Sequence, residues 1–358
     1  MVLYPIWATR SPITTRKEAC TVKIKRMGRT GLKVSEICLG TMTFGNQCDE
    51  PTSHAIMDTA FASGVTFFDT ADAYPLGAKP DMLGRTEEYI GRWLNASEGR
   101  REQIVLATKF RMPMGPNPNN QGASRKHILA AIEASLRRLN TDYIDLYQIH
   151  APDPETPIDE TLHTLDDLVR SGKVRYIGCS NYPAWELCKA LWTSDRLGLA
   201  RFDCVQPRYN ILFRHIEGEL FPLVLDQGLG VISYNPLAGG LLTGRYQVGQ
   251  QPGEGTRFTL HNAGKLYQQR YWQEPQMQAV DALKKFCSER NISVAQLAIA
   301  WVLEQPAITS AIVGASKPEH LEQTLPAVDF ELDDEMRAVC DDVWYQLPRE
   351  RNKAVAYR

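Results

Sequence analysis

Four side chains that can transfer protons follow three successive apolar segments of the sequence. They are Asp69 and Tyr74 after Thr66–Phe68, Lys109 after Ile104–Thr108, and His150 after Tyr143–Gln148. If these segments are parallel strands, their C-terminal ends share one edge of the sheet, and functional side chains gather at that edge in a barrel. A carboxylate, a phenol, an amine and an imidazole are therefore expected to meet.

This combination of groups suits the reduction of a carbonyl. A free tyrosine phenol has a pKa of about 10 and is a weak acid at neutral pH, but a neighbouring ammonium group lowers that pKa. Lys109 is expected to supply the ammonium, Asp69 to keep it protonated, and His150 to donate a hydrogen bond to the substrate oxygen. No side chain can supply a hydride, so a nicotinamide or flavin is required.

Each residue has an ordinary alternative role when it is considered alone. An aspartate after an apolar strand, such as Asp69, is more often a cap or turn residue. An isolated lysine or tyrosine is usually a surface or packing residue, and an isolated histidine is more often a core or loop residue. Their joint placement after three successive strands favours the catalytic interpretation.

The chain around these residues alternates apolar, β-rich segments with helical segments. The predicted strands are Ile37–Leu39, Thr66–Phe68, Ile104–Thr108, Tyr143–Gln148, Val174–Gly178, Asp203–Gln206, Gly230–Tyr234 and Thr309–Val313. The predicted helices are Thr52–Ser63, Arg85–Asn95, Arg125–Leu139, Ile158–Ser171, Pro183–Trp192, Ile216–Gln227, Pro275–Glu289 and Pro318–Leu325. Strands that are apolar on both faces and alternate with helices predict an α/β fold, the closed (β/α)8 TIM barrel.

Four features depart from this repeat. Val22–Met27 and Lys33–Val34 predict an N-terminal β-hairpin. The long polar segment Arg245–Trp272 after the seventh strand is expected to be a loop that covers the catalytic face. Ser293–Leu303 lies inside the last connection, and Asp333–Trp344 predicts an extra C-terminal helix outside the barrel.

The bulk composition excludes several classes of protein. With 43% hydrophobic residues the chain can bury a large core, and its net charge of -2 gives no basic field for nucleic acid or an anionic membrane. No segment is long and apolar enough for a secretory signal or a membrane span. We therefore expect a cytoplasmic protein with a single barrel domain over residues 22–358, after an N-terminal extension, residues 1–21, of unknown purpose.

The sequence does not predict a metal site. Its eight cysteines include no C-x-x-C pair, which argues against both a zinc site and a disulfide scaffold. A metal-dependent hydrolase on the same barrel would need several histidine and aspartate ligands at strand ends, and only His150 of the seven histidines is placed there.

Several stretches resemble the aldo-keto reductase superfamily, in the bacterial branch near the potassium-channel β-subunit-like reductases. They are GVTFFDTADAY (64–74), ATK (107–109), ASLRRLNTDYIDLYQIH (134–150), GKVRYIGCSNY (172–182), QPRYN (206–210), SYNPLAGGLLTG (233–244) and IVGASKPEHL (312–321). The resemblance runs from Gly28 to about Gln346. It implies a catalytic tetrad of Asp69, Tyr74, Lys109 and His150, with Tyr74 as the general acid.

The same resemblance implies a nicotinamide cofactor. Ser180, Asn181 and Gln206 would hold the carboxamide, and Tyr234 would stack on the ring. The other implied cofactor-binding residues are Thr41, Met42, Asn235, Pro236, Leu237, Gly239, Leu241, Gly244, Arg245, Arg257, Gly314, Ser316, Lys317, His320, Gln323 and Thr324. A hydroxyl and an ammonium, from Ser316 and Lys317, at a helix N-terminus suit an added 2′-phosphate, so NADPH is favoured over NADH.

The sequence also departs from the family pattern near the expected pocket. Pro75–Arg85 is longer than the usual turn after the tyrosine, and Thr324 stands where related sequences often have asparagine. The pocket is expected to include Met42, Phe44, Phe110 and Met112, with Tyr267, Tyr271 and Trp272 from the covering loop. Core packing is an equal alternative for Phe110 and Met42.

The leading hypothesis is NADPH-dependent reduction of a small-molecule aldehyde or ketone to the alcohol, with the proton from Tyr74. The alternative is an ancillary subunit that binds the cofactor without turnover, like a potassium-channel β subunit. The resemblance favours the enzyme because those subunits typically carry asparagine where this chain has His150. Steroid-like, terpenoid and sugar carbonyls all remain open, as does assembly into a homo-oligomer.

Overall fold

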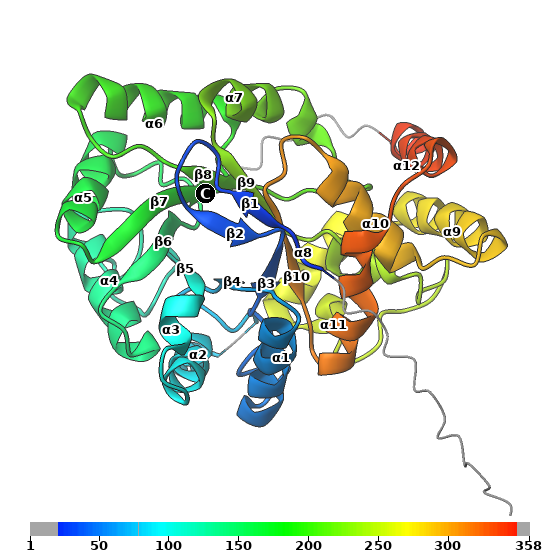
Figure 1. Cartoon of the computed structure of the whole chain (residues 1–358), viewed down its shortest axis with the longest axis horizontal. Coiled ribbons are helices and arrows are strands. Elements are labelled where there is room, and N and C mark those ends of the chain that lie inside the picture. The colour runs from blue at the N-terminus through cyan, green and yellow to red at the C-terminus, as the bar shows by residue number, and fades with distance from the viewer. Residues whose placement is uncertain (1–20, 78, 349–358) are drawn as a thin grey trace, which may run out of the picture.

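Eight parallel strands form a closed barrel that is surrounded by helices (Figure 1). The computed structural model describes residues 21–77 and 79–348. The barrel strands are β3 (Ile37–Gly40), β4 (Phe67–Asp69), β5 (Val105–Phe110), β6 (Ile144–Ile149), β7 (Val174–Ser180), β8 (Cys204–Gln206), β9 (Gly230–Ser233) and β10 (Ser310–Gly314). Pairing of β10 with both β3 and β9 closes the ring, so the predicted TIM-barrel class is confirmed.

The helices follow the strands around the outside of the barrel. They include α1 (Glu50–Ala62), α2 (Arg85–Asn95), α3 (Arg100–Gln103), α4 (Arg125–Leu139), α5 (Ile158–Arg170), α6 (Ala184–Leu197), α7 (Leu220–Gln227) and α11 (Pro318–Thr324). The sequence of α4 explains its bounds. The Ser124 side chain accepts a hydrogen bond from the His127 N–H at the first turn, and Asn140, at a φ of 49°, ends the helix in the left-handed conformation. Ile128 and Ile132 on one face are buried against the barrel.

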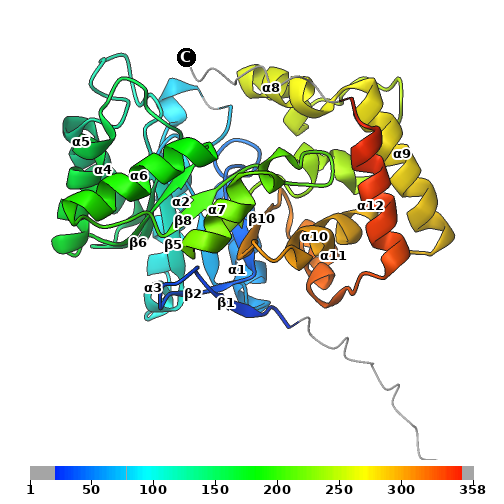
Figure 2. The same ribbon diagram turned by 90° about the horizontal axis from the view of Figure 1, so that it is seen from above.

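An antiparallel hairpin closes the end of the barrel where the strands begin. It consists of β1 (Ile24–Arg26) and β2 (Lys33–Ser35), as predicted. In Figure 2 the hairpin lies at the opposite end of the barrel from helix α8 (His261–Tyr271). Gly28, at a φ of +52°, touches the barrel so closely that a Cβ atom there would lie 2.4 Å from the Gly228 carbonyl oxygen. The opposite end, where the strands finish, carries the candidate site.

The predicted loop Arg245–Trp272 is partly wrong, because its second half forms helix α8. Phe258 packs edge to face on both Trp272 and Tyr246, with ring centroids 4.6 and 5.6 Å apart. Because the segment is polar overall, its composition does not reveal this aromatic cluster. The cluster provides the apolar surface on which the helix packs.

The remaining C-terminal helices lie on one side of the barrel. Ser293–Leu303 becomes helix α10 (Val294–Glu304), whose first turn is capped by the Ser293 side chain. The predicted C-terminal helix is present as α12 (Asp334–Gln346), and it packs against α9 (Glu274–Glu289) outside the barrel (Figure 1).

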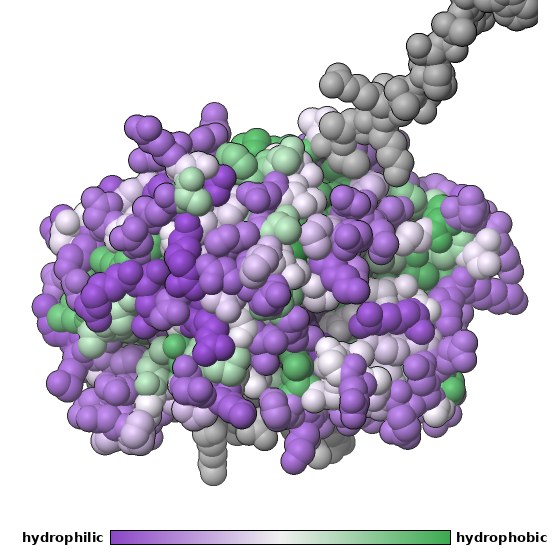
Figure 3. Space-filling view, turned by 90° about the horizontal axis from the view of Figure 1, so that it is seen from below, coloured by the Kyte–Doolittle hydropathy of each residue, from purple (hydrophilic) through white to green (hydrophobic). Residues whose placement is uncertain are grey.

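Within the described ranges, no helix is long and apolar enough to cross a membrane. The face on the side of α1 and α2 is mostly hydrophilic, with scattered hydrophobic side chains (Figure 3). The seven cysteines in the described part of the chain are all free, and no cluster of metal-ligating side chains occurs there. Residues 1–20, most of the predicted N-terminal extension, lie outside the described residues.

Candidate active site

The four side chains predicted to act together meet at the C-terminal end of the barrel. The rings of Tyr74 and His150 lie edge to face with centroids 5.8 Å apart. The Lys109 Nζ atom lies 5.2 Å from the centre of the Tyr74 ring and donates a hydrogen bond to Asp69 Oδ2. The ends of β4, β5 and β6 thus bring together the groups that the sequence places after these strands.

The four groups form two layers. Lys109 is 0% exposed and Asp69 is 2% exposed, whereas Tyr74 and His150 are partly exposed. Lys109 Nζ also donates to the Thr70 carbonyl oxygen at 2.9 Å. A fixed, buried ion pair therefore lies below a phenol and an imidazole that a ligand can reach.

The second oxygen of Asp69 is held by two glutamines. Gln206 Nε2 donates to Asp69 Oδ1 at 2.8 Å, and Gln148 Nε2 donates to the same atom at 3.1 Å. Gln148 was missed from the sequence because it lies inside an apolar strand. A polar amide in a strand that is otherwise buried is the signal that could have identified it.

The charges of the buried pair affect the titration of their neighbours. Burial tends to lower the pKa of Lys109, but the charge of Asp69, the Tyr74 phenol and the hydrogen bond to Asp69 act together in the opposite direction, so the net pKa of Lys109 is raised. Burial raises the pKa of Tyr74, and the opposing effect of Lys109 is smaller. The expectation that Lys109 lowers the Tyr74 pKa below its ordinary value is therefore wrong for this structure, because desolvation of the phenolate dominates.

His150 is a neutral imidazole at physiological pH. Burial, followed by the positive charges of Lys109 and Arg111, holds its pKa well below the usual range. Its backbone carbonyl accepts a hydrogen bond from Asn181 Nδ2 at 2.9 Å, and Asn181 Oδ1 accepts one from the Tyr234 hydroxyl at 2.7 Å. The imidazole can thus donate a hydrogen bond without carrying a charge.

Several residues assigned to cofactor binding form hydrogen bonds within the protein at the C-terminal end of the barrel. Ser180 Oγ donates to the Gln206 carbonyl oxygen at 2.8 Å, and Thr41 Oγ1 donates to the Asp69 carbonyl oxygen at 2.9 Å. The side chains of Ser180, Thr41 and Gln206 are buried. Asn181 and Tyr234 are more exposed and lie beside His150.

The loop after β9 contains further residues assigned to cofactor binding. The residues assigned to it are Asn235, Pro236, Leu237, Gly239, Leu241, Gly244 and Arg245. Asn235 has a φ of 61°, and its buried Nδ2 atom has no hydrogen-bond partner within residues 21–77 and 79–348. A Cβ on Gly239 would lie 2.7 Å from the Tyr267 ring, so packing on α8 explains this glycine. The Leu241 side chain lies in the core, which leaves only its backbone for a cofactor.

Polar and basic groups gather at the start of α11. Ser316 Oγ lies 3.3 Å from His320 Nδ1, and Lys317 is exposed beside them. Burial, then Arg245 and Lys317, lower the pKa of His320. Gly314 and Gln323 are exposed nearby in the sequence, whereas the buried Thr324 hydroxyl donates to the His320 carbonyl oxygen at 2.8 Å.

These donors fit a nicotinamide dinucleotide. The partly exposed Tyr234 and Asn181 can meet a planar amide-bearing ring, and Asn235, in the loop that contains the positive-φ glycines, has an amide nitrogen without a hydrogen-bond partner among the described residues. Arg257, assigned to the same cofactor, lies 3.8 Å from the Met42 sulfur and is 5.5 Å from the centre of the Tyr267 ring. It therefore joins α8 to the loop after β3.

Comparison with known proteins identifies the family. A family model described as "Aldo/keto reductase family" matches residues 36–345. The chain belongs to the aldo/keto reductase family. It is 40% identical over 335 residues to "Uncharacterized oxidoreductase YrpG" of Bacillus subtilis (strain 168), which covers 92% of this chain and 98% of that protein.

Two further relatives show the range of this aldo/keto reductase family. "Probable voltage-gated potassium channel subunit beta" of Arabidopsis thaliana is 37% identical over 310 residues, covering 86% of this chain and 92% of its own length. "Protein tas" of Escherichia coli (strain K12) is 34% identical over 342 residues, covering 89% of this chain and 96% of its own length. The protein is an oxidoreductase of this family, whose members generally use nicotinamide cofactors.

The predicted substrate pocket of this aldo/keto reductase needs correction. Phe44 and Phe110 are fully buried, and Phe110 stacks on Tyr147 with centroids 4.8 Å apart, so both belong to the hydrophobic core. Met42 and Met112 are partly exposed and remain candidates.

The aromatic residues expected from the covering segment, Arg245–Trp272, fall into two groups, one near the site and one packed inside the segment. Tyr267 donates to Asn235 Oδ1 at 3.2 Å, and its charge acts on the pKa of Tyr74, so it lies close to the site. Tyr271 is buried beside Asn210, and Trp272 packs on Tyr246 and Phe258. These two side chains stabilise the segment that contains α8.

The loop after Tyr74 is anchored at both ends. The Leu76 N–H donates to the Met42 carbonyl oxygen at 2.9 Å, and the Gly84 N–H donates to the Tyr74 carbonyl oxygen at 3.0 Å. The described residues at both ends of this loop therefore lie at the border of the candidate pocket.

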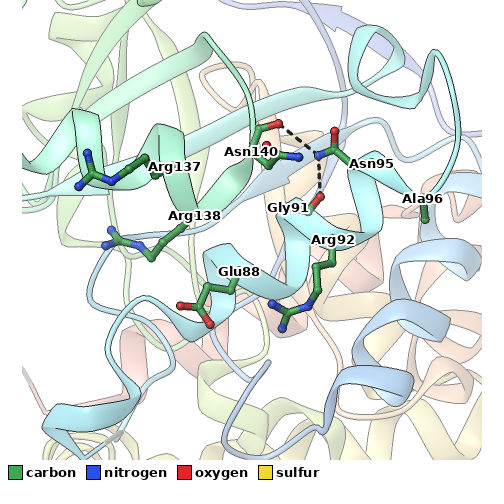
Figure 4. Close-up of a pocket in the computed structure, with 8 residues that line it drawn as sticks. All are labelled: Glu88, Gly91, Arg92, Asn95, Ala96, Arg137, Arg138 and Asn140. Carbon is green, nitrogen blue, oxygen red and sulfur yellow. Dashed lines mark hydrogen bonds between the residues drawn. The ribbon is translucent and has the colours of Figure 1, made fainter.

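A groove of 550 Å³ between α2 and α4 does not contribute to this site (Figure 4). It contains none of the four candidate catalytic residues. Two of its arginines already form ion pairs, Arg138 with Glu87 and Arg92 with Glu50. The groove is therefore separate from the barrel mouth, and two of its three arginines are held by acids of the protein.

Asp72 is a buried acid that sequence reasoning missed. It is 1% exposed, and neither carboxylate oxygen has a hydrogen-bond partner of standard geometry among the described residues. Burial, then the charge of Glu87, raise its pKa well above the usual range. Glu87 itself accepts from Thr108 at 2.6 Å and pairs with Arg138. Asp72 is thus a neutral acid behind the active site.

Replacing Asp72 by asparagine is expected to stabilise the protein at neutral pH. Because the pKa of Asp72 is higher in the folded than in the unfolded state, its contribution to stability is present below its unfolded pKa and is lost as pH rises. Asp72→Asn should exceed the wild type in free energy of unfolding at pH 7, and by less at pH 4.5. Urea unfolding at both pH values measures this; an equal difference at both would contradict a neutral Asp72.

Proposed function

We propose that this protein is an NADPH-dependent reductase of aldehydes or ketones, with Tyr74 as the proton donor. The observation that supports this most is the two-layer arrangement at the barrel mouth. The partly exposed Tyr74 and His150 lie over the buried Lys109–Asp69 ion pair. Each group in this set has a use in carbonyl reduction and little use in simple packing.

The residues divide the work of proton transfer. The His150 imidazole, held neutral, donates a hydrogen bond that orients the carbonyl oxygen. Tyr74 gives its proton to the developing alkoxide, and the Lys109 ammonium 5.2 Å from the ring centre stabilises the phenolate left behind. Asp69 and the two glutamines keep Lys109 charged and fixed. A bound nicotinamide supplies the hydride.

Preference for NADPH is proposed from the basic group at the start of α11. Lys317 and the Ser316–His320 pair can receive a phosphate, and Arg245 lies close enough to affect the pKa of His320. NADH lacks the phosphate that these groups would bind. A phosphate site here would affect affinity for the cofactor and would leave the chemistry at Tyr74 unchanged.

Replacing Lys317 by alanine is expected to weaken NADPH binding by about fivefold to tenfold and to leave NADH binding nearly unchanged. A charge-assisted hydrogen bond contributes about 1.5 kcal/mol, and the exposure of Lys317 reduces this. Fluorescence titration of the protein with each cofactor measures both affinities. Lys126→Ala removes an exposed lysine on α4 as the control. Equal losses for NADPH and NADH in Lys317→Ala would count against a phosphate site.

The function is tested by NADPH oxidation in the presence of a panel of aldehydes and ketones. Oxidation that depends on both the protein and the carbonyl is the expected result. The alternative ancillary function rests on the likeness to the potassium channel β subunits, and it predicts NADPH binding without carbonyl-dependent oxidation across the panel. That outcome would replace the proposed function.

We also propose a location, a domain organisation and a type of substrate for this protein. We infer a cytoplasmic enzyme, in one domain over residues 22–358, that acts on a small-molecule carbonyl and not on nucleic acid. The net charge of -2 supports the exclusion of polyanions.

A further inference from the structure

Arg111 lies beside the candidate catalytic histidine. Strands β5 and β6 are parallel, and Phe110 at the end of β5 is the register partner of Ile149. The next residues along these strands are Arg111 and His150, and the His150 N–H donates to the Phe110 carbonyl oxygen at 3.0 Å. The charge of Arg111 helps to lower the pKa of His150, which also indicates that the two side chains are close.

The backbone at Arg111 is strained. Its φ of 109° lies in the region that favours glycine, and a bulky residue rarely adopts it. The Arg111 carbonyl oxygen accepts a hydrogen bond from the Gly122 N–H at 2.9 Å, which holds the turn. Strained residues of this kind occur preferentially at functional sites. Glycine would satisfy the same turn, so the arginine side chain needs another explanation.

The Arg111 guanidinium has unused hydrogen-bonding capacity. Its Nε atom is buried and has no hydrogen-bond partner in the described ranges. The charge of Arg111 acts on the pKa of Asp153, but the Asp153 carboxylate accepts from the Ala123 N–H and the Thr156 hydroxyl at Oδ2 and from the Glu155 N–H at Oδ1. Lys109 is paired with Asp69, whereas Arg111 forms no ion pair within 4.0 Å with any acid in the part of the chain that the structure describes.

We propose that Arg111 binds a carboxylate on the substrate, so that this enzyme prefers carbonyl compounds that carry an anionic group. A guanidinium offers two parallel N–H donors that match the two oxygens of a carboxylate. The partly exposed side chain adjoins His150, which places the anionic group on the same side of the mouth as the hydrogen bond to the carbonyl. This inference rests on the proposed carbonyl reduction.

The test uses aldehydes that differ only in charge. 3- and 4-Carboxybenzaldehyde are each compared with their methyl esters, and the ratio of kcat/KM for acid over ester is measured with NADPH. The wild type is expected to favour the acid at one ring position at least. Arg111→Gln should lower that ratio by about tenfold or more, and Arg111→Lys by less, because lysine keeps the charge but not the paired donors.

Two further variants separate recognition from structure. Arg137→Gln removes an exposed arginine on α4 and should leave the ratio unchanged. Arg111→Gly suits the local backbone, so it should lose the preference for the acid without a fall in Tm. A fall in Tm of Arg111→Gly with an unchanged acid-to-ester ratio would mean that Arg111 is only structural, and would overturn the proposal.

Binding distinguishes failure of this inference from failure of the proposed function. Calorimetric titration of the protein loaded with NADPH uses 4-carboxybenzyl alcohol and its methyl ester. Tighter binding of the acid by the wild type, lost in Arg111→Gln, supports the inference even if no aldehyde is reduced, and absence of reduction then counts only against the proposed function. Equal binding of acid and ester, together with equal kcat/KM values, overturns the inference alone.

Discussion

Replacing Tyr74 by phenylalanine is expected to lower kcat for carbonyl reduction by about 10³-fold, while the protein still binds NADPH. The variant keeps the ring that lies against His150 and above Lys109 and removes only the hydroxyl group that carries the proton. General acid catalysis by a positioned side chain contributes about 10²- to 10⁴-fold, which sets the size of the effect. Steady-state NADPH oxidation with a reactive aldehyde, together with fluorescence titration of NADPH, measures both quantities.

Tyr345→Phe is the matched control for this variant. Tyr345 is 62% exposed on α12, away from the barrel mouth, so its hydroxyl should have no effect on kcat. A Tyr74→Phe variant that reduces carbonyls as fast as the wild type would remove Tyr74 from the mechanism.

Replacing Lys109 by methionine is expected to destabilise the protein by about 3–5 kcal/mol and to reduce kcat at least as much as Tyr74→Phe. Methionine fills most of the space but leaves the Asp69 carboxylate, which is 2% exposed, without its counter-ion. The ammonium that would stabilise the Tyr74 phenolate is lost at the same time.

The contribution of Lys109 to stability should persist up to mildly alkaline pH. Because the pKa of Lys109 is raised in the folded state, its contribution to stability is fully present below its unfolded value and is lost only as pH rises through the higher folded value. Urea unfolding of the wild type and Lys109→Met at pH 6 and pH 9 should therefore give similar differences in free energy.

The double variant Lys109→Met, Asp69→Asn is the control for this prediction. It removes both charges and is expected to recover part of the stability without recovering activity. If the single and double variants are equally destabilised, the unpaired charge of Asp69 is not the cause.

Much of the fold could be predicted because its elements are encoded locally. Strands such as Ile144–Ile149 are short apolar segments between longer amphipathic helices, and parallel pairing follows from that alternation. The same alternation predicted that Asp69, Lys109 and His150 would meet, since parallel strands end on one face of a barrel.

Features that depend on packing between distant segments could not be predicted. Helix α8 forms on an aromatic cluster whose members, including Tyr246 and Trp272, are spread along a polar segment. Phe110 follows Lys109 but points to the opposite side of its strand, into the core against Tyr147. The raised pKa of Tyr74 reflects how completely the folded chain desolvates the phenol, which spacing along a sequence does not reveal.

Transfer of deuterium from NADPH labelled at C4 of the nicotinamide tests the central claim most directly. The wild-type protein is incubated with an aldehyde and with each C4 epimer of the labelled cofactor in a separate reaction. The alcohol from each reaction is analysed by mass spectrometry. The account predicts an alcohol with deuterium on the former carbonyl carbon, from one epimer only. A protein that binds NADPH yet yields no labelled alcohol from any aldehyde or ketone tested would contradict it and favour a binding function.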